Sequence, residues 1–126
     1  KAIAMRVVAQ NIYESPAPNV IAEPQDRAEL MTLLLLDCEG DEELYLSEIA
    51  RAEAGATVLD LRDSILDTQL YPDGRVILEE LHHDEDGEAA TPPRRLEMTL
   101  PELRELILKW LEAKRLFYAQ RAAGAG

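Results

Sequence analysis

The pentapeptide at residues 71–75, Tyr-Pro-Asp-Gly-Arg, constrains the fold more than any other part of the sequence. Proline presets the backbone of a turn, and Gly74 suits the left-handed conformation that a hairpin with a bulge requires. A strand must therefore lie on each side, and we expect these strands at residues 66–70 and 76–81. In the first of them, leucine and threonine alternate with polar residues, which is typical of a strand with one buried face. The pair predicts a mainly antiparallel sheet.

Further candidate strands occur at residues 2–9, 56–61 and 95–98, where apolar and β-branched residues gather. Residues 30–38, LMTLLLLDC, are continuously apolar, which suits a central strand buried on both faces. Four consecutive leucines fit a helix equally well. We prefer a strand because Gly40 ends the run after few residues. The sequence thus predicts a sheet of about five strands.

Two main helices are expected. The first spans about residues 41–54, since Asp41 suits an N-cap and Gly55 suits the left-handed position after a helix. The second begins at Thr99, which forms a capping box with Glu102. Apolar residues then recur at helical spacing and should pack this long C-terminal helix on the sheet. They are Leu103, Leu106, Ile107, Trp110, Leu111, Phe117 and Tyr118.

Three segments are expected to lack regular structure. Prolines 16, 18 and 24 remove backbone donors across residues 14–26, which we interpret as a loop or arm. Residues 82–93 are polar and end in two prolines, so they should form another loop. The tail at 122–126 should fray. With 126 residues the chain is long enough for one core, and we expect a single α+β domain over residues 1–126.

The net charge of −12 is unevenly distributed. Residues 1–93 hold 21 acidic and 6 basic side chains, whereas residues 94–126 hold 4 acidic and 7 basic ones. An acidic field repels phosphate backbones and anionic membranes, so nucleic acid and membrane are disfavoured as partners. The same field attracts a basic protein. Solubility alone is the competing explanation of the charge.

Two acidic segments are the candidate partner-binding surface, at residues 37–43 and 79–88. Acidic segments are usually solvated surface. Both of these flank predicted strand ends, however, and carboxylates on a rigid sheet can capture a basic active site with fast association. The candidate residues are Glu39, Asp41, Glu42, Glu43, Glu79, Glu80, Asp84, Glu85, Asp86 and Glu88.

No catalytic, cofactor or metal site is predicted. His82 and His83 adjoin an acidic run, but aligning that run with a calcium loop places His82 and Pro93 where carboxylates are required. Zinc needs three or four converging ligands, and the chain has two histidines. Cys38 ends a leucine run and is expected to be a buried apolar group rather than a nucleophile. We therefore do not expect an enzyme.

Only a few residues bear on the cellular compartment of the protein and on its self-association. The short apolar stretch at residues 2–9 is interrupted by Arg6, unlike a signal-peptide core, and the single cysteine suits a reducing cytoplasm. Leu108 and Leu116 lie off the apolar stripe of the last helix. Either that helix is buried widely or these leucines form an interface, such as that of a homodimer.

Two parts of the chain carry a resemblance. The run LLLLDCEGDEELYLSEIARAEAG, then a hairpin, then LEMTLPELRELILKWLEAKRL are similar to bacterial immunity proteins of polymorphic toxin systems, over residues 30–55 and 95–116. This family includes the contact-dependent growth inhibition and Rhs immunity proteins. The resemblance implies a cytoplasmic protein that binds one cognate toxin, commonly a nuclease or another enzyme attacking nucleic acid or ribosomes, and occludes its active site. The proline-rich segment at 14–26 and the basic last helix depart from that pattern.

The sequence therefore predicts an antitoxin that masks a basic toxin domain with acidic loops and needs no cofactor. A small enzyme or ligand-binding domain with a pocket between sheet and helices is the first alternative. A homo-oligomeric accessory protein is the second.

Overall fold

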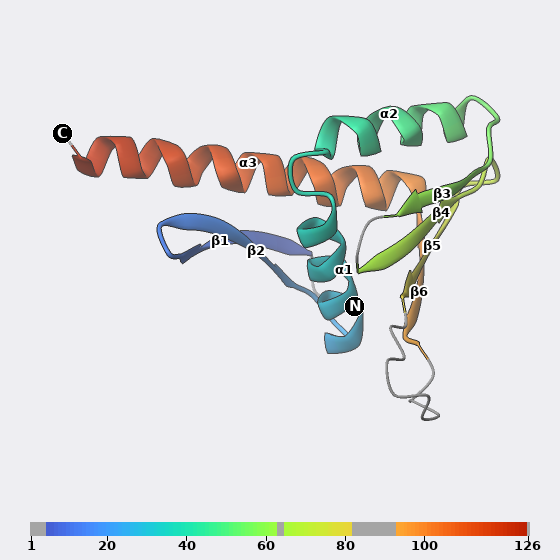
Figure 1. The fold of residues 1–126 in the computed structure, drawn as a ribbon, viewed down its shortest axis with the longest axis horizontal. Coiled ribbons are helices and arrows are strands. Elements are labelled where there is room, and N and C mark those ends of the chain that lie inside the picture. Colours follow the sequence, from blue (N-terminus) through green and yellow to red (C-terminus); the bar gives the residue numbers. More distant parts are fainter. Residues whose placement is uncertain (1–4, 63–64, 82–92, 126) are drawn as a thin grey trace.

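A computed structural model describes residues 5–62, 65–81 and 93–125 of the chain (Figure 1). The fold is α+β, and the long C-terminal helix packs on the sheet, as the sequence predicts. The described part contains three helices and two antiparallel sheets, one of two strands and one of four. The elements are β1 (Arg6–Ile12), β2 (Ser15–Ile21), α1 (Gln25–Asp37), α2 (Glu42–Glu53), β3 (Val58–Arg62), β4 (Leu66–Leu70), β5 (Arg75–Glu80), β6 (Arg95–Thr99) and α3 (Leu100–Ala125).

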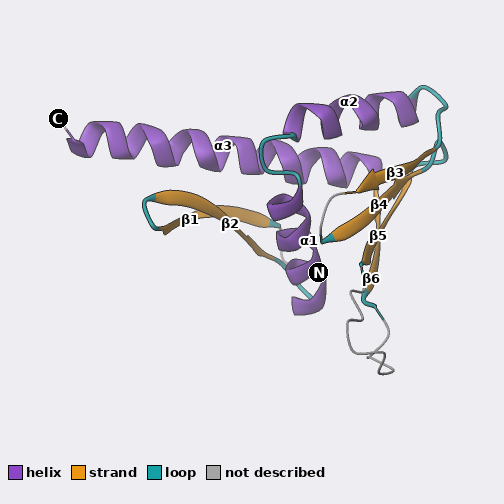
Figure 2. Cartoon of the chain, viewed as in Figure 1, coloured by secondary structure: helices purple, strands orange, loops and turns teal. Residues whose placement is uncertain are grey.

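The four-stranded sheet has the order β3-β4-β5-β6, and Figure 2 shows the three helices on one side of it. Alternate residues of β4 and β5 point to this side and are completely buried, among them Leu66, Leu70 and Leu78. Asp67 and Glu79, which are paired with each other across β4 and β5, point to the opposite side. The sheet therefore has one covered face and one open face, and the core lies between the covered face and the helices.

The hairpin predicted at residues 71–75 is confirmed. Gly74 has a φ of +103°, and the Tyr71 amide donates to the Arg75 carbonyl at 2.9 Å. The capping box is confirmed as well, because the Thr99 amide donates to Glu102 Oε1 at 2.9 Å and the Glu102 amide to Thr99 Oγ1 at 3.2 Å. The helix expected near residues 41–54 is α2. These elements were predictable because their signals are local.

The strand predicted at residues 30–38 is wrong, because this segment forms most of α1. Its leucines are not all buried as a central strand would require, since Leu34 and Leu35 are fully buried while Leu36 is exposed. Burial recurs instead at helical spacing, on one side of a 13-residue helix. The helix begins at Gln25, directly after Pro24, within the segment for which the sequence predicts a loop.

The loop or arm predicted at residues 14–26 is also wrong, because residues 15–21 form β2 and pair with β1. The two strands are joined by a two-residue turn in which Tyr13 and Glu14 have φ values of +51° and +67°. Pro16 and Pro18 are tolerated because β2 is an edge strand, whose outward positions need no amide donor. The extra hairpin explains why two sheets occur where one of about five strands was expected.

The expected fraying at 122–126 is wrong for residues 122–125, which continue α3. Figure 1 shows the second half of this helix extending beyond the four-stranded sheet, with β1 and β2 alongside it. The apolar stripe is therefore not buried to the same degree along the whole helix. Trp110 is completely buried, whereas Phe117 is half-buried and Tyr118 is exposed. Only the part of the stripe that lies under α2 and the sheet belongs to the core.

Candidate partner-binding surface

The connection between α1 and α2 carries the first acidic segment. Asp37, at the end of α1, is buried and accepts hydrogen bonds from the amides of Ile65 at 3.1 Å and Leu66 at 2.8 Å. These bonds fasten the start of β4 to α1. A buried carboxylate requires such partners, so the role of Asp37 is structural.

Glu39 and Glu42 both bind α3, but only Glu42 is buried, and the Glu39 side chain remains 48% exposed. Lys114 Nζ lies 2.6 Å from a Glu42 carboxylate oxygen and 3.2 Å from one of Glu39, and the Trp110 indole donates to Glu39 at 3.1 Å. Lys114 also stacks over the Trp110 ring, 5.2 Å from its centroid. This group of four side chains, here called the Lys114 clamp, joins the α1–α2 turn to α3.

Burial and charge oppose each other in the clamp. Glu42 is 6% exposed, and this burial alone would raise its pKa, but the hydrogen bond from Lys114 and backbone amide donors lower the pKa below its ordinary value. Burial likewise opposes the charge on Lys114, yet hydrogen bonds to Glu42 and Glu39 raise its pKa. Both side chains are therefore held in their charged forms.

Asp41 and Glu43 are the members of the first segment that point outwards. Both are exposed, and no ion pair is recorded for either within the part of the chain that the structure describes. They lie at the N-terminal end of α2, where negative side chains also interact favourably with the helix dipole. The clamp below them fixes the position of this end of α2.

The second acidic segment also contains one carboxylate that is paired within the chain and one for which no pair is recorded in the described residues. Glu80 is bound to Arg94, whose guanidinium lies 3.0 Å from Glu80 and 2.6 Å from Glu29 of α1, and these hydrogen bonds raise the pKa of Arg94. Glu79 is half-buried on the open face of the sheet, and no ion pair is recorded for it among residues 5–62, 65–81 and 93–125. Asp84, Glu85, Asp86 and Glu88 lie outside the described residues.

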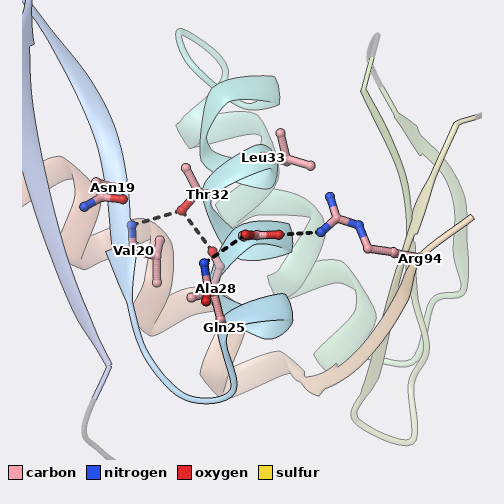
Figure 3. A pocket seen from close by; sticks show the side chains of 8 residues that line it. Asn19, Val20, Gln25, Ala28, Thr32, Leu33 and Arg94 are labelled. Atoms are coloured by element: carbon pink, nitrogen blue, oxygen red, sulfur yellow. Dashed lines mark hydrogen bonds and ion pairs between the residues drawn. The ribbon is translucent and has the colours of Figure 1, made fainter.

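Arg94 also borders a pocket of about 440 Å³ between β2 and α1 (Figure 3). The polar side chains around it bind one another. Gln25 and Arg94 both reach Glu29, while Thr32 accepts the Val20 amide at 3.0 Å and donates to the Ala28 carbonyl. A small polar ligand would have to displace these bonds, so the pocket supports a structural role more than a ligand site.

The charged side chains as a whole leave a surplus of carboxylates. Apart from Arg6 and Arg95, every lysine or arginine side chain that the structure describes forms an ion pair with a carboxylate of the same chain. No such pair is recorded in these residues for six carboxylates. They are Glu23, Asp26, Asp41, Glu43, Asp67 and Glu79.

Cys38 has no access to solvent, and burial, followed by the charges of Glu42 and Glu39, raises its pKa to about 12. The thiol stays protonated near neutral pH, so it is a poor nucleophile. In the described residues no group of three or more His, Cys, Asp or Glu side chains could hold a metal ion. His82 and His83 lie outside those residues.

Two apolar features lie away from the acidic segments. Leu108 and Leu116 are 49% and 45% exposed, which contradicts the alternative that the last helix is buried widely. The second feature is the tip of the β1–β2 hairpin, where Tyr13 is 97% exposed. The sequence reasoning missed this tip because it treated the segment as a loop. The turn contains neither glycine nor asparagine, which are the usual signals.

Comparison with protein families, with curated proteins and with solved structures finds no match to the chain. Among the described helices, none combines the length and the apolar character that crossing a bilayer requires.

Proposed function

We propose that this chain is the immunity protein of a bacterial polymorphic toxin system of the contact-dependent growth inhibition or Rhs type. It acts in the cytoplasm, binds one cognate basic toxin domain and occludes its active site with an acidic surface. The toxin is a nuclease or another enzyme that attacks nucleic acid or ribosomes. The resemblance of residues 30–55 and 95–116 to such proteins motivates the class.

The observation that carries the mechanism is a difference in pairing: most cations are paired within the chain, whereas several carboxylates are not. Nearly all described cations are neutralised by carboxylates of the same chain, so the charge left for a partner is mainly negative. Asp41 and Glu43 are exposed parts of this surplus. A basic protein is steered towards such groups, and its association is accelerated.

The structural support for Asp41 and Glu43 matters for affinity. Both belong to the end of α2 that the Lys114 clamp fixes to α3, so little conformational freedom remains to be lost on binding. An enzyme that acts on nucleic acid binds phosphates through cationic side chains. Carboxylates in fixed positions can take the place of those phosphates, and they block the site without chemistry or a cofactor.

Reversing both charges in the variant Asp41→Lys/Glu43→Lys should weaken binding to the toxin at least about tenfold at low salt, mainly by slowing association. The loss should shrink as salt is raised, because screening removes the steering contribution in both proteins. Surface plasmon resonance against the basic protein encoded next to this gene, at a series of salt concentrations, measures both effects.

The matched control is Glu105→Lys/Glu112→Lys on α3, which changes the net charge equally at exposed positions. It should retain most of the affinity, since the location of the charges decides binding. A third variant, Asp84→Lys/Glu85→Lys/Asp86→Lys, tests the second acidic segment. If neither acidic variant alters the affinity or its dependence on salt, the electrostatic mechanism is wrong. If no neighbouring protein binds the wild-type chain, the immunity function itself is wrong.

A further inference from the structure

The two outer edges of the β1–β2 hairpin differ in their hydrogen-bonding capacity. On β2, the amide of Val20 points outwards and donates to Thr32 of α1 at 3.0 Å. Pro16 and Pro18 lie two and four residues earlier and therefore face the same outer edge, where they have no amide to offer. This edge of the hairpin is closed to another strand.

The edge of β1 is open. Val20, Pro18 and Pro16 are paired with Val7, Ala9 and Asn11. These pairs are not hydrogen-bonded to each other, so the amides and carbonyls of the three β1 residues also point away from the hairpin. Met5 lies two residues before Val7, so its backbone groups point to the same outer edge, and its carbonyl accepts a hydrogen bond from Lys109 there. For the outward groups of Val7, Ala9 and Asn11, no hydrogen bond is recorded among the described residues.

A groove of about 440 Å³ runs along this open edge, between β1 and the second half of α3. Val7 and Ala9 line one wall, while Ala113, Leu116 and Phe117 line the other. Figure 1 shows this part of α3 running beside the hairpin and away from the four-stranded sheet. Lys109, Glu112 and Gln120 add polar groups to the lining. A free strand edge above a partly apolar groove is a template for the addition of a strand.

The charges around the groove argue against a basic occupant. We call β1, β2 and residues 109–125 of α3 the wing. The wing carries more basic than acidic side chains, in contrast to the rest of the molecule: Arg6, Lys109, Lys114, Arg115 and Arg121 against Glu14 and Glu112. Four of these five cations pair with carboxylates of the same chain, so the wing lacks the surplus of carboxylates that would attract a basic toxin domain.

We propose that a second copy of this chain occupies the groove, with the two β1 strands paired antiparallel about a two-fold axis at Ala9. The pairing sets Ala9 opposite Ala9 and Val7 opposite Asn11, and it satisfies the outward amides and carbonyls of all three residues. The two hairpins then form one sheet of order β2-β1-β1-β2. The second halves of the two α3 helices meet beneath this sheet around Leu116. Such an interface is isologous and closed.

Two features of the hairpin favour a second copy over an unrelated strand. In the symmetric pairing Arg6 lies diagonally across from Glu14 of the second copy. The Glu14 side chain is 84% exposed, and besides its pair with Arg121 it can supply a counter-ion that Arg6 lacks among the described residues of its own chain. Tyr13, 97% exposed and held by a turn with positive φ, lies opposite Met5 of the second copy. Tyrosine is enriched among the residues that contribute most to protein–protein binding.

The first test uses Ala9→Pro. This substitution removes only an outward amide, as Pro16 and Pro18 already do on β2, so the hairpin stays intact while two symmetry-related hydrogen bonds of the dimer are lost. Ala9→Ser keeps the amide and is the control. Sedimentation velocity from low to high micromolar protein should show the wild type approaching twice 14.1 kDa. Ala9→Pro should dimerise at least about tenfold more weakly, and Ala9→Ser within about twofold of the wild type.

The second test places a charge in the groove. Leu116→Glu should weaken dimerisation at least about tenfold, because it buries a carboxylate against its own symmetry mate. Leu108→Glu is the matched control. Leu108 is a similarly exposed leucine of the same helix, but it does not line the groove. Circular dichroism spectra and thermal unfolding establish that all four variants are folded.

Three results would overturn the proposal. The first is a wild-type chain that remains at 14.1 kDa at every concentration. The second is a dimer that Ala9→Pro leaves unchanged while Leu108→Glu disrupts it, which would place the interface on another face of α3. The third is a wild-type monomer whose binding to the neighbouring protein is abolished by Ala9→Pro, since the edge would then accept a strand of the toxin. The first two results need no toxin, so they are independent of the proposed immunity function.

Discussion

Replacing Trp110 by alanine should lower the free energy of unfolding by about 3–5 kcal/mol. Trp110 has no solvent exposure and sits where α3 passes beneath α2 and the α1–α2 turn. The substitution leaves a cavity that these packed elements cannot fill, and it removes the indole donor of Glu39 and the ring beneath Lys114. A domain of this size has a total stability of only about 5–15 kcal/mol. We therefore expect the substitution to remove a substantial share of the total stability and to move the urea unfolding midpoint to a lower concentration.

Urea unfolding followed by circular dichroism measures this loss, since fluorescence would be altered by removal of the only tryptophan. Tyr118→Ala is the control. It removes an aromatic side chain from the same helix at a position that is exposed, and it should change stability by no more than about 0.5 kcal/mol. Equal losses from the two substitutions would show that Trp110 is not part of the core.

The parts of the fold that could be predicted are those whose signals lie within a few residues. Proline and Gly74 determine the β4–β5 turn, and Thr99 with Glu102 determines the start of α3. The nature of α1 depends on more distant groups. A run of leucines is compatible with a helix or a strand, and the choice is made by what surrounds it. Here Asp37 must reach the amides of Ile65 and Leu66, about 28 residues along the chain.

β2 shows a second limit of sequence reasoning. Prolines usually indicate a loop, yet Pro16 and Pro18 occupy strand positions whose amides face outwards. Whether a proline is permitted depends on which edge of the hairpin it faces, and that is decided by the pairing with β1. The same alternation shows which edge of the hairpin is free. A feature misread in the sequence thus becomes the basis of the proposed dimer.

The sequence shows where the acidic segments are, but it could not tell which carboxylates are available to a partner. Glu39 and Glu42 are separated from Lys114 by 75 and 72 residues, and only the fold brings them together. Pairing with cations of the same chain therefore neutralises about half of the described candidates. The carboxylates at 41 and 43 are left exposed, and their position depends on the clamp below them.

Replacing Lys114 by methionine should cost about 2–3 kcal/mol of stability near neutral pH, less than the usual cost of breaking a fully buried ion pair because Glu39 is partly exposed. Methionine retains most of the volume, so the loss is mainly that of Glu42 left charged and buried without a cation. Arg115→Met is the control. Its ion pair with Glu112 is exposed, and its removal should change stability by no more than about 0.5 kcal/mol.

The cost of Lys114→Met should depend on pH in a defined direction. In the wild type the pKa of Glu42 is lowered from its ordinary value of 4.5, so its contribution to stability is present above that value and is lost as the pH falls through the lowered pKa. Without Lys114, burial raises the pKa of Glu42, and the carboxylate takes up a proton at a higher pH. The difference between the two proteins should therefore be largest near neutral pH. It should begin to shrink above pH 4.5, where Glu42 of the variant takes up a proton, and should go on shrinking until the pH has fallen through the lowered pKa of the wild type.

The double variant Glu42→Gln/Lys114→Met separates the charge from the packing. It leaves no unpaired buried charge, so it should be more stable near neutral pH than Lys114→Met alone, and its stability relative to the wild type should vary less with pH. Urea unfolding at neutral and acid pH measures the stability of the wild type, Lys114→Met, Arg115→Met and the double variant. If Lys114→Met costs the same at both pH values, or if Glu42→Gln gives no rescue, the stabilising role of Lys114 is packing of its methylene chain against Trp110 rather than the ion pair with Glu42.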